Sequence, residues 1–317
     1  MKRLKIKTEM CLLILVSLLL LGIIGNSHVH NRRAKAEYND LSARLDAIND
    51  LLVESNDKSD TLLAKRNYSF DYSWTKTSPL IAHAFGAIDG ITYTNSLEAF
   101  EHNYSLGHRI FEVDFDVTDE GVLILAHDEA SWRLETGVSV DVPYTYENYI
   151  NTPLYDKYTS LDYQDLLQLM IEYPDIYIVT DTKYYDETTV YLQFSQLVRK
   201  ANAIDPKLLD RIIPQIYCEQ MLDWVMDIHP FRSIIYTLYA DPSWTLDTVY
   251  NFALNTGVKC VTLHYTVATS ERIGHWNQAG IIIGAHTNND RIEAQALFDA
   301  GVDVMYTDFL TPDQFGG

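Results

Sequence analysis

The sequence predicts an α/β fold in which a (β/α)8 TIM barrel follows an N-terminal membrane segment and a helical stalk. Short apolar runs alternate with longer helix-like segments from about residue 79 onward, which is typical of βαβ units and a parallel sheet. Roughly eight such units within about 240 residues is the size of a TIM barrel. Many of the apolar runs also end in polar residues that can carry chemistry, as in the active-site face of such barrels.

Residues 1–35 predict a membrane segment that is not part of the barrel. A basic start is followed by an apolar run from Met10 to Ile24, which is the pattern of a membrane anchor or of a signal peptide. We expect an uncleaved anchor, and the alternative is a cleaved signal peptide. Both interpretations place the rest of the chain outside the cytoplasm.

Residues 36–78 predict a helical stalk and a linker. Between 36 and 66 the chain is charged and lacks glycine and proline. Apolar residues recur there at the three-to-four spacing of an amphipathic helix, at Leu41, Leu45, Ile48 and Leu52. Tyr, Ser and Thr become frequent over 67–78, which is typical of a linker. We therefore expect the barrel domain over residues 79–317.

The composition argues against a general nucleic-acid-binding protein. The chain has 24 Lys and Arg against 44 Asp and Glu, a formal net charge of −20, whereas phosphate backbones are bound by basic residues. An acidic protein that handles an anionic substrate needs a bound cation or a local basic group at its site. Cys218 and Cys260 could form a disulfide in an exported protein, but nothing in their spacing favours one, and we expect two buried thiols.

Most of the apolar runs end in a residue that can take part in catalysis or metal binding. These residues are His83, Asp114, His127, Asp181, His264, His286 and Asp308. The carboxyl ends of the strands of a parallel barrel share one face, and that face carries the active site. Any one of these residues could instead simply begin an exposed loop, and His264 and His286 could be structural histidines. So many of them in one chain favour a common site.

Glu112 and Asp114 lie two residues apart in an apolar run, so their side chains should point to the same side of a strand. Two carboxylates that face each other repel, and one takes up a proton unless a cation lies between them. A divalent cation with oxygen ligands, Ca²⁺ or Mg²⁺, resolves this conflict. The sequence therefore predicts a metal site on this strand.

A turn at Asp119-Glu120-Gly121 should bring a histidine to these carboxylates. If the flanking runs pair as an antiparallel hairpin, the numbers of paired residues add up to about 240. Position 112 would then face about 128, and position 114 would face about 126. His127 is therefore expected beside the two acids.

Two further residues complete the predicted site. The run over 176–181 ends with Asp181, which can give the cation a third carboxylate, and Lys183 can contact an anionic substrate. Together with His83, these groups are what phosphodiester cleavage needs. One histidine would accept a proton from the attacking hydroxyl or water, and the other would protonate the leaving oxygen. The sequence does not say which histidine has which role.

The segment IAHAFGAIDGITYTNSLEAFEHNYSLGHRIFEVDFDVTDEGVLILAHDE resembles the opening of the glycerophosphodiester phosphodiesterase family, within the phosphatidylinositol-phosphodiesterase-like barrel superfamily. VTDTK and IIIGAHTNNDRIEAQALFDAGVDVMYTDF are similar to later motifs of that family, and the likeness covers about 79–312. The resemblance implies a TIM barrel and hydrolysis of a phosphodiester with one divalent cation, Ca²⁺ or Mg²⁺. It also implies His83 and His127 as the acid–base pair, and Lys183 as a phosphate contact. The implied metal ligands are Glu112, Asp114 and Asp181.

The resemblance leaves the substrate open, because the chain departs from the family pattern. The family usually has Arg directly after its first histidine, where this chain has Ala84, and His286 stands where a Trp is common. The function expected first is metal-dependent hydrolysis of a glycerophosphodiester, or a related phosphodiester, outside the cytoplasm, to an alcohol and glycerol phosphate. One alternative is phospholipase D/C-like cleavage of intact lipid head groups. The other is a catalytically silent barrel that binds a phosphorylated ligand.

Residues 129–160 are longer than an ordinary barrel connection. The tyrosines in this segment are Tyr144, Tyr146, Tyr149, Tyr155 and Tyr158. We interpret the segment as a lid that shapes substrate choice, and the alternative is a capping subdomain that only packs.

Overall fold

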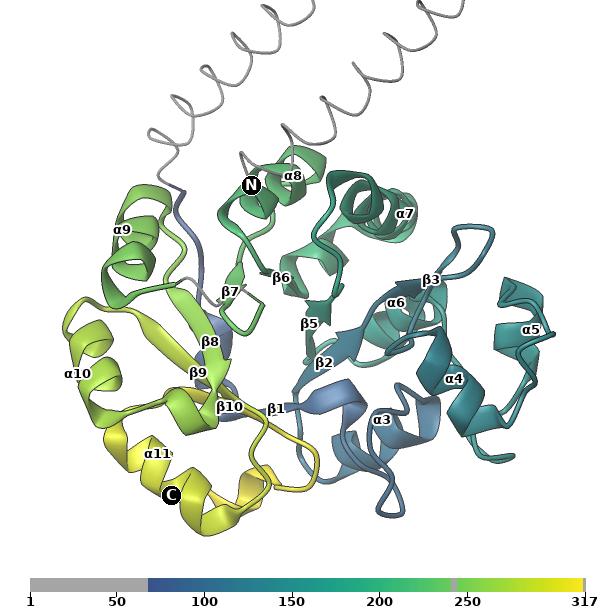
Figure 1. The fold of residues 1–317 in the computed structure, drawn as a ribbon, viewed down its shortest axis with the longest axis horizontal. Helices are drawn as coiled ribbons and strands as arrows, with labels where there is room; N and C mark the ends of the chain where they lie inside the picture. Colours follow the sequence, from purple (N-terminus) through teal and green to yellow (C-terminus); the bar gives the residue numbers. More distant parts are fainter. Residues whose placement is uncertain (1–67, 241–243, 316–317) are drawn as a thin grey trace, which may run out of the picture. The chain divides into compact units, whose positions relative to one another are not determined.

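The computed structural model describes residues 68–240 and 244–315. Within them, eight parallel strands form a closed barrel (Figure 1). The strands are β1 (Leu80–Ala82), β2 (Ile110–Asp114), β5 (Tyr177–Asp181), β6 (Ile212–Ile216), β7 (Ile235–Thr237), β8 (Cys260–His264), β9 (Ile282–His286) and β10 (Val304–Thr307). The barrel closes where β1 pairs with β10, with Ala82 opposite Thr307. The predicted TIM barrel is confirmed.

Helices alternate with the strands and surround the barrel (Figure 1). They are α3 (Leu97–Ser105), α6 (Tyr163–Glu172), α7 (Glu187–Ile204), α8 (Glu219–Ile228), α9 (Leu246–Thr256), α10 (Ser270–Gln278) and α11 (Arg291–Ala300). Most of them begin after a side chain that accepts a hydrogen bond from the first turn. Asp162 before α6 and Thr245 before α9 form complete capping boxes, which satisfy backbone N–H groups that the helix itself leaves unpaired.

The barrel has an apolar interior below its active face and a second core between strands and helices. The interior core consists of Trp74, Ile81, Ile110, Val179, Ile213, Ile235, Cys260, Val304 and Tyr306. Gly284 on β9 lacks a side chain for a packing reason, because a Cβ there would lie 2.5 Å from the Cγ2 atom of Thr262. Toward the carboxyl ends of the strands, the side chains that point into the barrel become polar and form the candidate site.

Residues 68–78, the described part of the predicted linker, pack against the barrel. The Tyr68 N–H donates to the carbonyl of Thr256 over 2.8 Å. Trp74 is buried in the interior core, and its indole Nε1 donates to Ser233 Oγ over 2.8 Å. The predicted membrane segment over 1–35 and the stalk up to residue 66 lie outside the described residues. No helix among the described residues is long and apolar enough to cross a membrane.

The predicted hairpin is present but shorter than expected. Strands β3 (Asp116–Val117) and β4 (Leu123–Ile124) pair antiparallel in the predicted register, with Asp116 opposite Ile124. The expectation that positions 112 and 114 face 128 and 126 is wrong, because the barrel holds that part of β2 between β1 and β5. Asp114 lies opposite Asp181 of β5 instead.

The segment after the hairpin folds into a small unit with a core of its own. It contains α4 (Glu129–Thr136) and α5 (Tyr146–Asn151), packed around Trp132. Tyr144, Tyr149 and Tyr158 are buried in this core, which favours the capping subdomain over a lid whose tyrosines contact substrate. Cys218 is half-buried, Cys260 is buried, and no disulfide joins them.

Candidate active site

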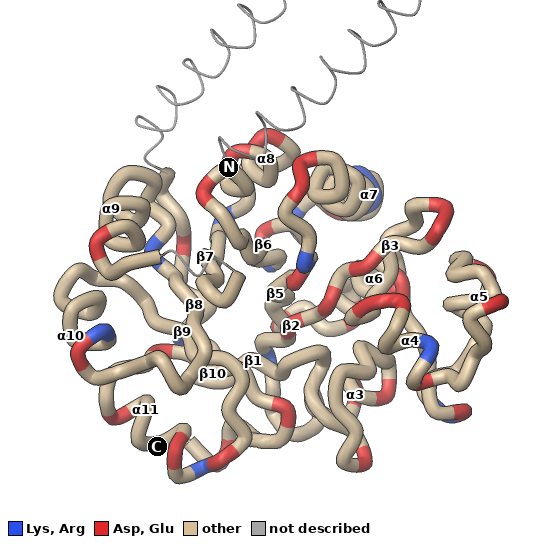
Figure 2. Tube along the Cα trace, in the orientation of Figure 1, with Lys and Arg blue, Asp and Glu red and all other residues tan. Residues whose placement is uncertain are grey.

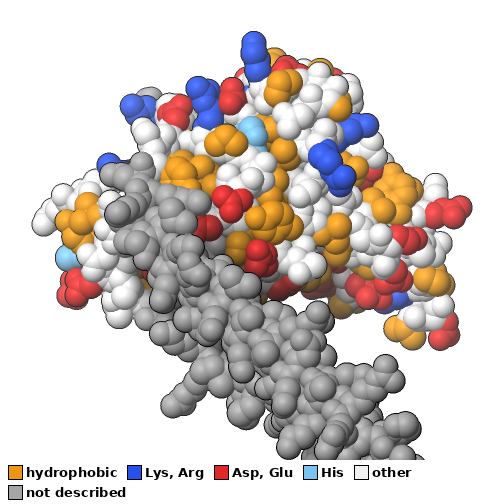
Figure 3. All heavy atoms as spheres, turned by 90° about the horizontal axis from the view of Figure 1, so that it is seen from above, with side chains coloured by type: hydrophobic (Ala, Val, Ile, Leu, Met, Phe, Trp, Pro, Cys, Tyr) orange, Lys and Arg blue, Asp and Glu red, His pale blue; other side chains and the backbone are white. Residues whose placement is uncertain are grey.

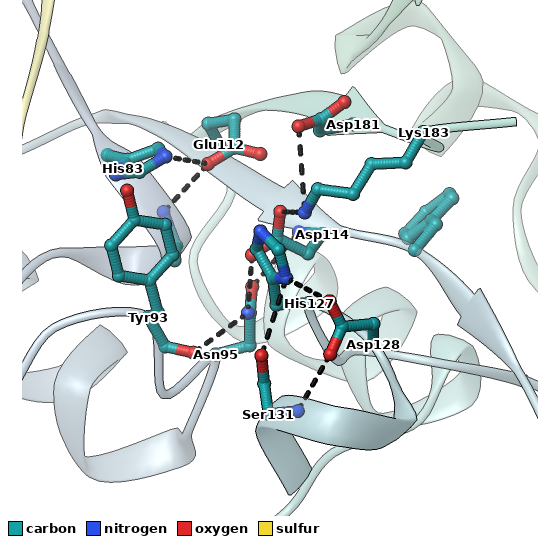
Figure 4. A network of polar contacts seen from close by, with 12 residues as sticks. His83, Tyr93, Asn95, Glu112, Asp114, His127, Asp128, Ser131, Asp181 and Lys183 are labelled. Atoms are coloured by element: carbon teal, nitrogen blue, oxygen red, sulfur yellow. Dashed lines mark hydrogen bonds and ion pairs between the residues drawn. The ribbon is translucent and has the colours of Figure 1, made fainter. Parts of the chain in front are cut away.

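The structure brings the six predicted site residues together at the carboxyl ends of the strands (Figure 4). They come from the end of β1 (His83), from β2 (Glu112 and Asp114), from the end of β5 and the next turn (Asp181 and Lys183) and from the segment after β4 (His127). Acidic residues gather around β2, β3 and β5, and basic residues also lie close to β5 (Figure 2).

Glu112, Asp114 and Asp181 form a buried carboxylate cluster that fits a divalent cation. One oxygen from each lies within 4.8 Å of the others. Glu112 Oε2 accepts a hydrogen bond from the Ala84 N–H over 2.7 Å, but its Oε1 is buried and has no partner among the described residues. Burial, followed by the charge of Asp114, raises the pKa of Glu112 to about 8, and burial also raises the pKa of Asp181. A cation with oxygen ligands would satisfy the unpaired oxygen and relieve the repulsion.

Asn95 and Lys183 hold the Asp114 carboxylate in place. Asn95 Nδ2 donates to Asp114 Oδ2 over 2.8 Å, and Asn95 Oδ1 accepts from the Asp114 backbone N–H over 3.0 Å. Lys183 Nζ forms an ion pair with Asp114 and lies 3.7 Å from Asp181 Oδ2. Burial alone would raise the pKa of Asp114, but the positive charges of Lys183 and His83 outweigh it and lower that pKa. Asp114 is therefore the carboxylate of the cluster that remains ionised.

His83 is oriented by Asp308, which follows β10. His83 Nδ1 donates to Asp308 Oδ1 over 2.8 Å, and this bond leaves Nε2 facing the cluster, 4.0 Å from Glu112 Oε2. Burial would lower the pKa of His83. The hydrogen bond to Asp308 and the charges of Glu112 and Asp114 oppose it and raise that pKa to about 9.

His127 is oriented in the same way by its neighbour in the sequence. His127 Nδ1 donates to Asp128 Oδ2 over 2.8 Å, and Asp128 Oδ1 accepts from the Ser131 N–H over 2.7 Å. The Tyr93 ring lies between the two histidines, with ring centroids 4.6 Å from His83 and 5.5 Å from His127. Both imidazoles therefore lie against the Tyr93 ring and close to the carboxylate cluster (Figure 4).

Tyr93 and Asn95 were not assigned to this site from the sequence, and Asp308 was expected at the same face without a role. Asp308 was noted as a polar strand end, and its contact with His83 follows once β1 and β10 are known to pair. Asn95 lies in the segment that carries the family resemblance, but its bond to Asp114 requires the register of the loop before α3. Tyr93 has no signal in the sequence that separates it from other tyrosines.

A small cavity of about 50 Å³ lies inside the barrel mouth, next to the cluster. Its lining includes His83, Glu112 and Asp181, together with Tyr239 and His286. The Nε2 atom of His286 is buried and has no hydrogen-bond partner among the described residues. Burial lowers the pKa of His286 to about 4, so this ring is neutral near pH 7.

The metal-free domain is expected to lose stability as the pH rises from about 5 to about 9. The pKa of Glu112 is raised from 4.5 to about 8 and that of His83 from 6.5 to about 9. Between the unfolded and the folded pKa of each group, the folded chain therefore holds more protons than the unfolded chain. The stability of the fold is lost as the pH rises through these ranges and those protons leave. Thermal unfolding in a chelator should show Tm falling by roughly 5 °C or more across this range.

The control for this prediction is the variant Glu112→Gln, which cannot ionise at that position. Its Tm should depend less on pH between 5 and 8, while the part of the slope that comes from His83 remains. Added Ca²⁺ or Mg²⁺ should also reduce the fall in the unmodified chain. An identical pH dependence in both proteins would show that Glu112 does not carry a raised pKa.

Comparison with known proteins identifies the family of this chain. The family model described as the glycerophosphoryl diester phosphodiesterase family matches residues 86–311. This chain belongs to that family. Its members are phosphoric diester hydrolases, so the chain is an enzyme of this class. No curated protein matches the chain.

Solved structures of this family share the fold. A phosphodiesterase from Oleispira antarctica, in complex with the product sn-glycerol-3-phosphate, is 16% identical, with a TM-score of 0.61 over 76% of this chain and 96% of its own. A glycerophosphodiester phosphodiesterase from Parabacteroides distasonis is 16% identical, with a TM-score of 0.60 over 75% of this chain and 95% of its own. One from Thermotoga maritima is 17% identical, with a TM-score of 0.53 over 73% of this chain and 94% of its own. At these identities, the likeness establishes the TIM barrel.

Proposed function

We propose that this enzyme hydrolyses a glycerophosphodiester, or a related phosphodiester, to an alcohol and glycerol phosphate. The observation that carries the proposal is the buried carboxylate cluster flanked by two imidazoles, each fixed at Nδ1 by its own carboxylate. The product bound in the Oleispira antarctica structure supports the choice of glycerol phosphate.

The phosphate group would bind between the carboxylate cluster and Lys183. A divalent cation held by Glu112, Asp114 and Asp181, Ca²⁺ or Mg²⁺, would offset negative charge on the phosphoryl oxygens. Burial disfavours the charge on Lys183, but Asp114 and Asp181 keep its pKa above the usual range. The ammonium group therefore stays charged and can donate to a phosphoryl oxygen.

The two histidines would move the protons of the reaction. A divalent cation bound at the cluster would offset the charges of Glu112 and Asp114, which raise the pKa of His83 in its absence. A neutral His83 would then accept a proton at Nε2 from the attacking hydroxyl or water as its oxygen bonds to phosphorus. His127 would donate a proton to the alcohol oxygen as its bond to phosphorus breaks. We assign this order because the His127 side chain is 33% exposed and that of His83 is 13% exposed, so the alcohol can depart past His127.

Ala84 stands where the family usually has an arginine, but position 84 still supports the carboxylate cluster through its backbone. Ala84 adopts a left-handed conformation with φ of 48°, and its backbone N–H donates to Glu112. That support needs no side chain. Lys183 and the cation would then carry the phosphate charge without a second basic residue, and the retained acids and histidines favour catalysis over a silent barrel.

We also propose that the enzyme is held at a membrane with its barrel outside the cytoplasm. The basic start and apolar run before Ile24 support this location. Protease added to intact cells should then cut the membrane-associated chain. Recovery of the chain in the cytoplasmic fraction, protected from protease, would overturn this proposal.

The test of the activity is release of glycerol phosphate by the purified chain. Deacylated glycerophosphodiesters and intact phospholipids should be compared, each with a chelator, with Ca²⁺ and with Mg²⁺. We expect cleavage of the deacylated substrates that is lost in chelator and restored by one of the two cations. Cleavage of intact lipids alone would favour the phospholipase alternative, and no metal-dependent cleavage of any phosphodiester would favour the silent barrel.

A further inference from the structure

Tyr93 lies against both imidazoles of the candidate active site. Its ring meets them edge to face, at interplanar angles of 80° with His83 and 82° with His127. The ring comes from the loop before α3, which also supplies Asn95 to the carboxylate cluster. One side chain therefore packs against both groups that would move protons in the reaction.

The needs of the fold do not account for a tyrosine at position 93. Its backbone has a φ of 65°, a left-handed conformation that is costly for a bulky side chain and that Gly or Asn adopts more easily. The side chain is 39% exposed, so it stabilises the fold less than a buried ring would. Hydrophobic side chains occur in several separate patches over the surface (Figure 3), so exposure by itself does not single out Tyr93. Its backbone conformation beside the two histidines does, because strain of this kind is concentrated at functional sites.

The Tyr93 hydroxyl group is available to a ligand. It has no hydrogen-bond partner among the described residues, whereas the hydroxyls of Tyr144 and Tyr184 both donate to Asp116. The ring points from its backbone toward His83, and the hydroxyl lies at that end of the ring (Figure 4). A donor without a partner is thus presented to the site beside one of its two imidazoles.

The position of Tyr93 matches that of a phosphoryl oxygen during hydrolysis. With one histidine at the attacking oxygen and the other at the leaving oxygen, these two oxygens lie roughly in line through phosphorus. The phosphoryl oxygens that do not react then point to the sides of that line, where negative charge must be stabilised. Lys183 lies on one side of His127 and Tyr93 on the other (Figure 4). Ala84, in place of the usual arginine, offers no side-chain donor, so a second donor has to come from elsewhere.

We propose that Tyr93 is a further catalytic residue, whose hydroxyl donates a hydrogen bond to a phosphoryl oxygen of the bound phosphodiester. This inference rests on the proposed function and adds a substrate contact to the same site. Burial, followed by the charge of Asp308, raises the pKa of Tyr93, so the hydroxyl keeps its proton near pH 7 and acts as a donor. The ring has a second effect, because it holds the two imidazoles apart on either side of the phosphorus atom.

The first experiment compares kcat and KM of the full chain and of Tyr93→Phe in the presence of the activating cation. Phe keeps the ring against both imidazoles and removes only the hydroxyl. We expect kcat to fall roughly 10- to 100-fold while KM stays within about twofold, since the hydrogen bond is strongest when charge builds up on the phosphoryl oxygen. An unchanged kcat would overturn the proposal.

Tyr155→Phe is the matched control for this variant. Tyr155 is also an exposed tyrosine with a left-handed backbone, but it belongs to the small unit that follows the hairpin. Its hydroxyl should have no effect on kcat. If Tyr155→Phe lowered kcat as much as Tyr93→Phe, loss of any exposed tyrosine hydroxyl would explain both results, and the proposal would be overturned.

A phosphorothioate substrate distinguishes the proposed contact from an effect that passes through the histidines. Replacing one phosphoryl oxygen by sulfur gives two isomers, and sulfur is the weaker hydrogen-bond acceptor. In the isomer whose sulfur faces Tyr93, the fall in kcat caused by Tyr93→Phe should be severalfold smaller than with the oxygen substrate, and the other isomer should show the full fall. An equal fall in both isomers would show that Tyr93 only positions the imidazoles.

Tyr93→Asn tests whether the ring serves the fold. Asn tolerates the left-handed backbone better than Tyr, so Tm should be unchanged or higher, while kcat should fall at least as far as in Tyr93→Phe. If Tyr93→Asn lowered Tm by several degrees and Tyr93→Phe kept its kcat, Tyr93 would be a structural residue.

A binding measurement does not depend on turnover. Calorimetry with sn-glycerol-3-phosphate, in the presence of Ca²⁺ or Mg²⁺, should show roughly fivefold weaker binding to Tyr93→Phe than to the unmodified chain, because the doubly charged phosphate accepts from the hydroxyl. If no phosphodiester is cleaved but Tyr93→Phe still weakens this binding, the proposed function fails and the contact with phosphate stands. If nothing is cleaved and binding is absent or equal in the two proteins, the contact is overturned as well.

Discussion

Glu112→Gln and Asp114→Asn are each expected to remove divalent-cation binding and to reduce kcat/KM by about 10³-fold or more, equivalent to about 4 kcal/mol of transition-state stabilisation. Both substitutions preserve shape and remove the charge that a cation requires. Glu112→Gln also removes a buried carboxylate that is costly without metal, so the metal-free variant should be at least as stable as the unmodified chain at pH 8. Calorimetric metal titration and steady-state kinetics would measure both effects.

Asp116→Asn provides the matched control for these variants. Asp116 is buried two residues beyond Asp114, but its carboxylate accepts from the hydroxyls of Tyr184 and Tyr144, outside the cluster. The amide oxygen of Asn can still accept such a bond, and metal binding should be unchanged. If Asp116→Asn weakened metal binding as much as Asp114→Asn, the effect would come from general electrostatics and not from ligation.

The barrel and the carboxylate cluster could be predicted because both depend on local pattern. Each interior strand is a short apolar run, and alternation along a strand places Glu112 and Asp114 on one side whatever the rest of the chain does. Asp181 could be added because parallel strands end on the same face of a barrel. These inferences required only the alternation of side chains along each strand, and not the register in which neighbouring strands pair.

The remaining parts of the site depend on register and on closure. His83 and Asp308 are 225 residues apart and meet because Ala82 pairs with Thr307, a fact that no local pattern contains. The route of His127 was predicted incorrectly because β3 and β4 have two residues each, too few for their pairing to reach β2. The position of Trp74 could not be predicted from local pattern either. Its Ser-rich surroundings in the sequence indicate a linker, although its indole is buried in the interior core of the barrel.

His83→Ala and His127→Ala are each expected to reduce kcat by about 10²- to 10⁴-fold with an ordinary alcohol as the leaving group. The activities of the two variants should differ when the leaving group no longer needs a proton. A glycerophosphodiester that carries p-nitrophenol should restore most of the activity of His127→Ala, because its oxygen can leave as an anion.

The same substrate should leave His83→Ala impaired, because attack on phosphorus still requires a base. Asp308→Asn should resemble a weaker form of His83→Ala, because the amide holds the ring less firmly and no longer favours a proton on Nδ1. Asp128→Asn should do the same for His127. Recovery of His83→Ala in place of His127→Ala would exchange the two roles, and recovery of neither would exclude acid catalysis by this pair. The difference in exposure between the two imidazoles predicts that His127→Ala recovers and His83→Ala does not, since the departing alcohol needs the open side of the site.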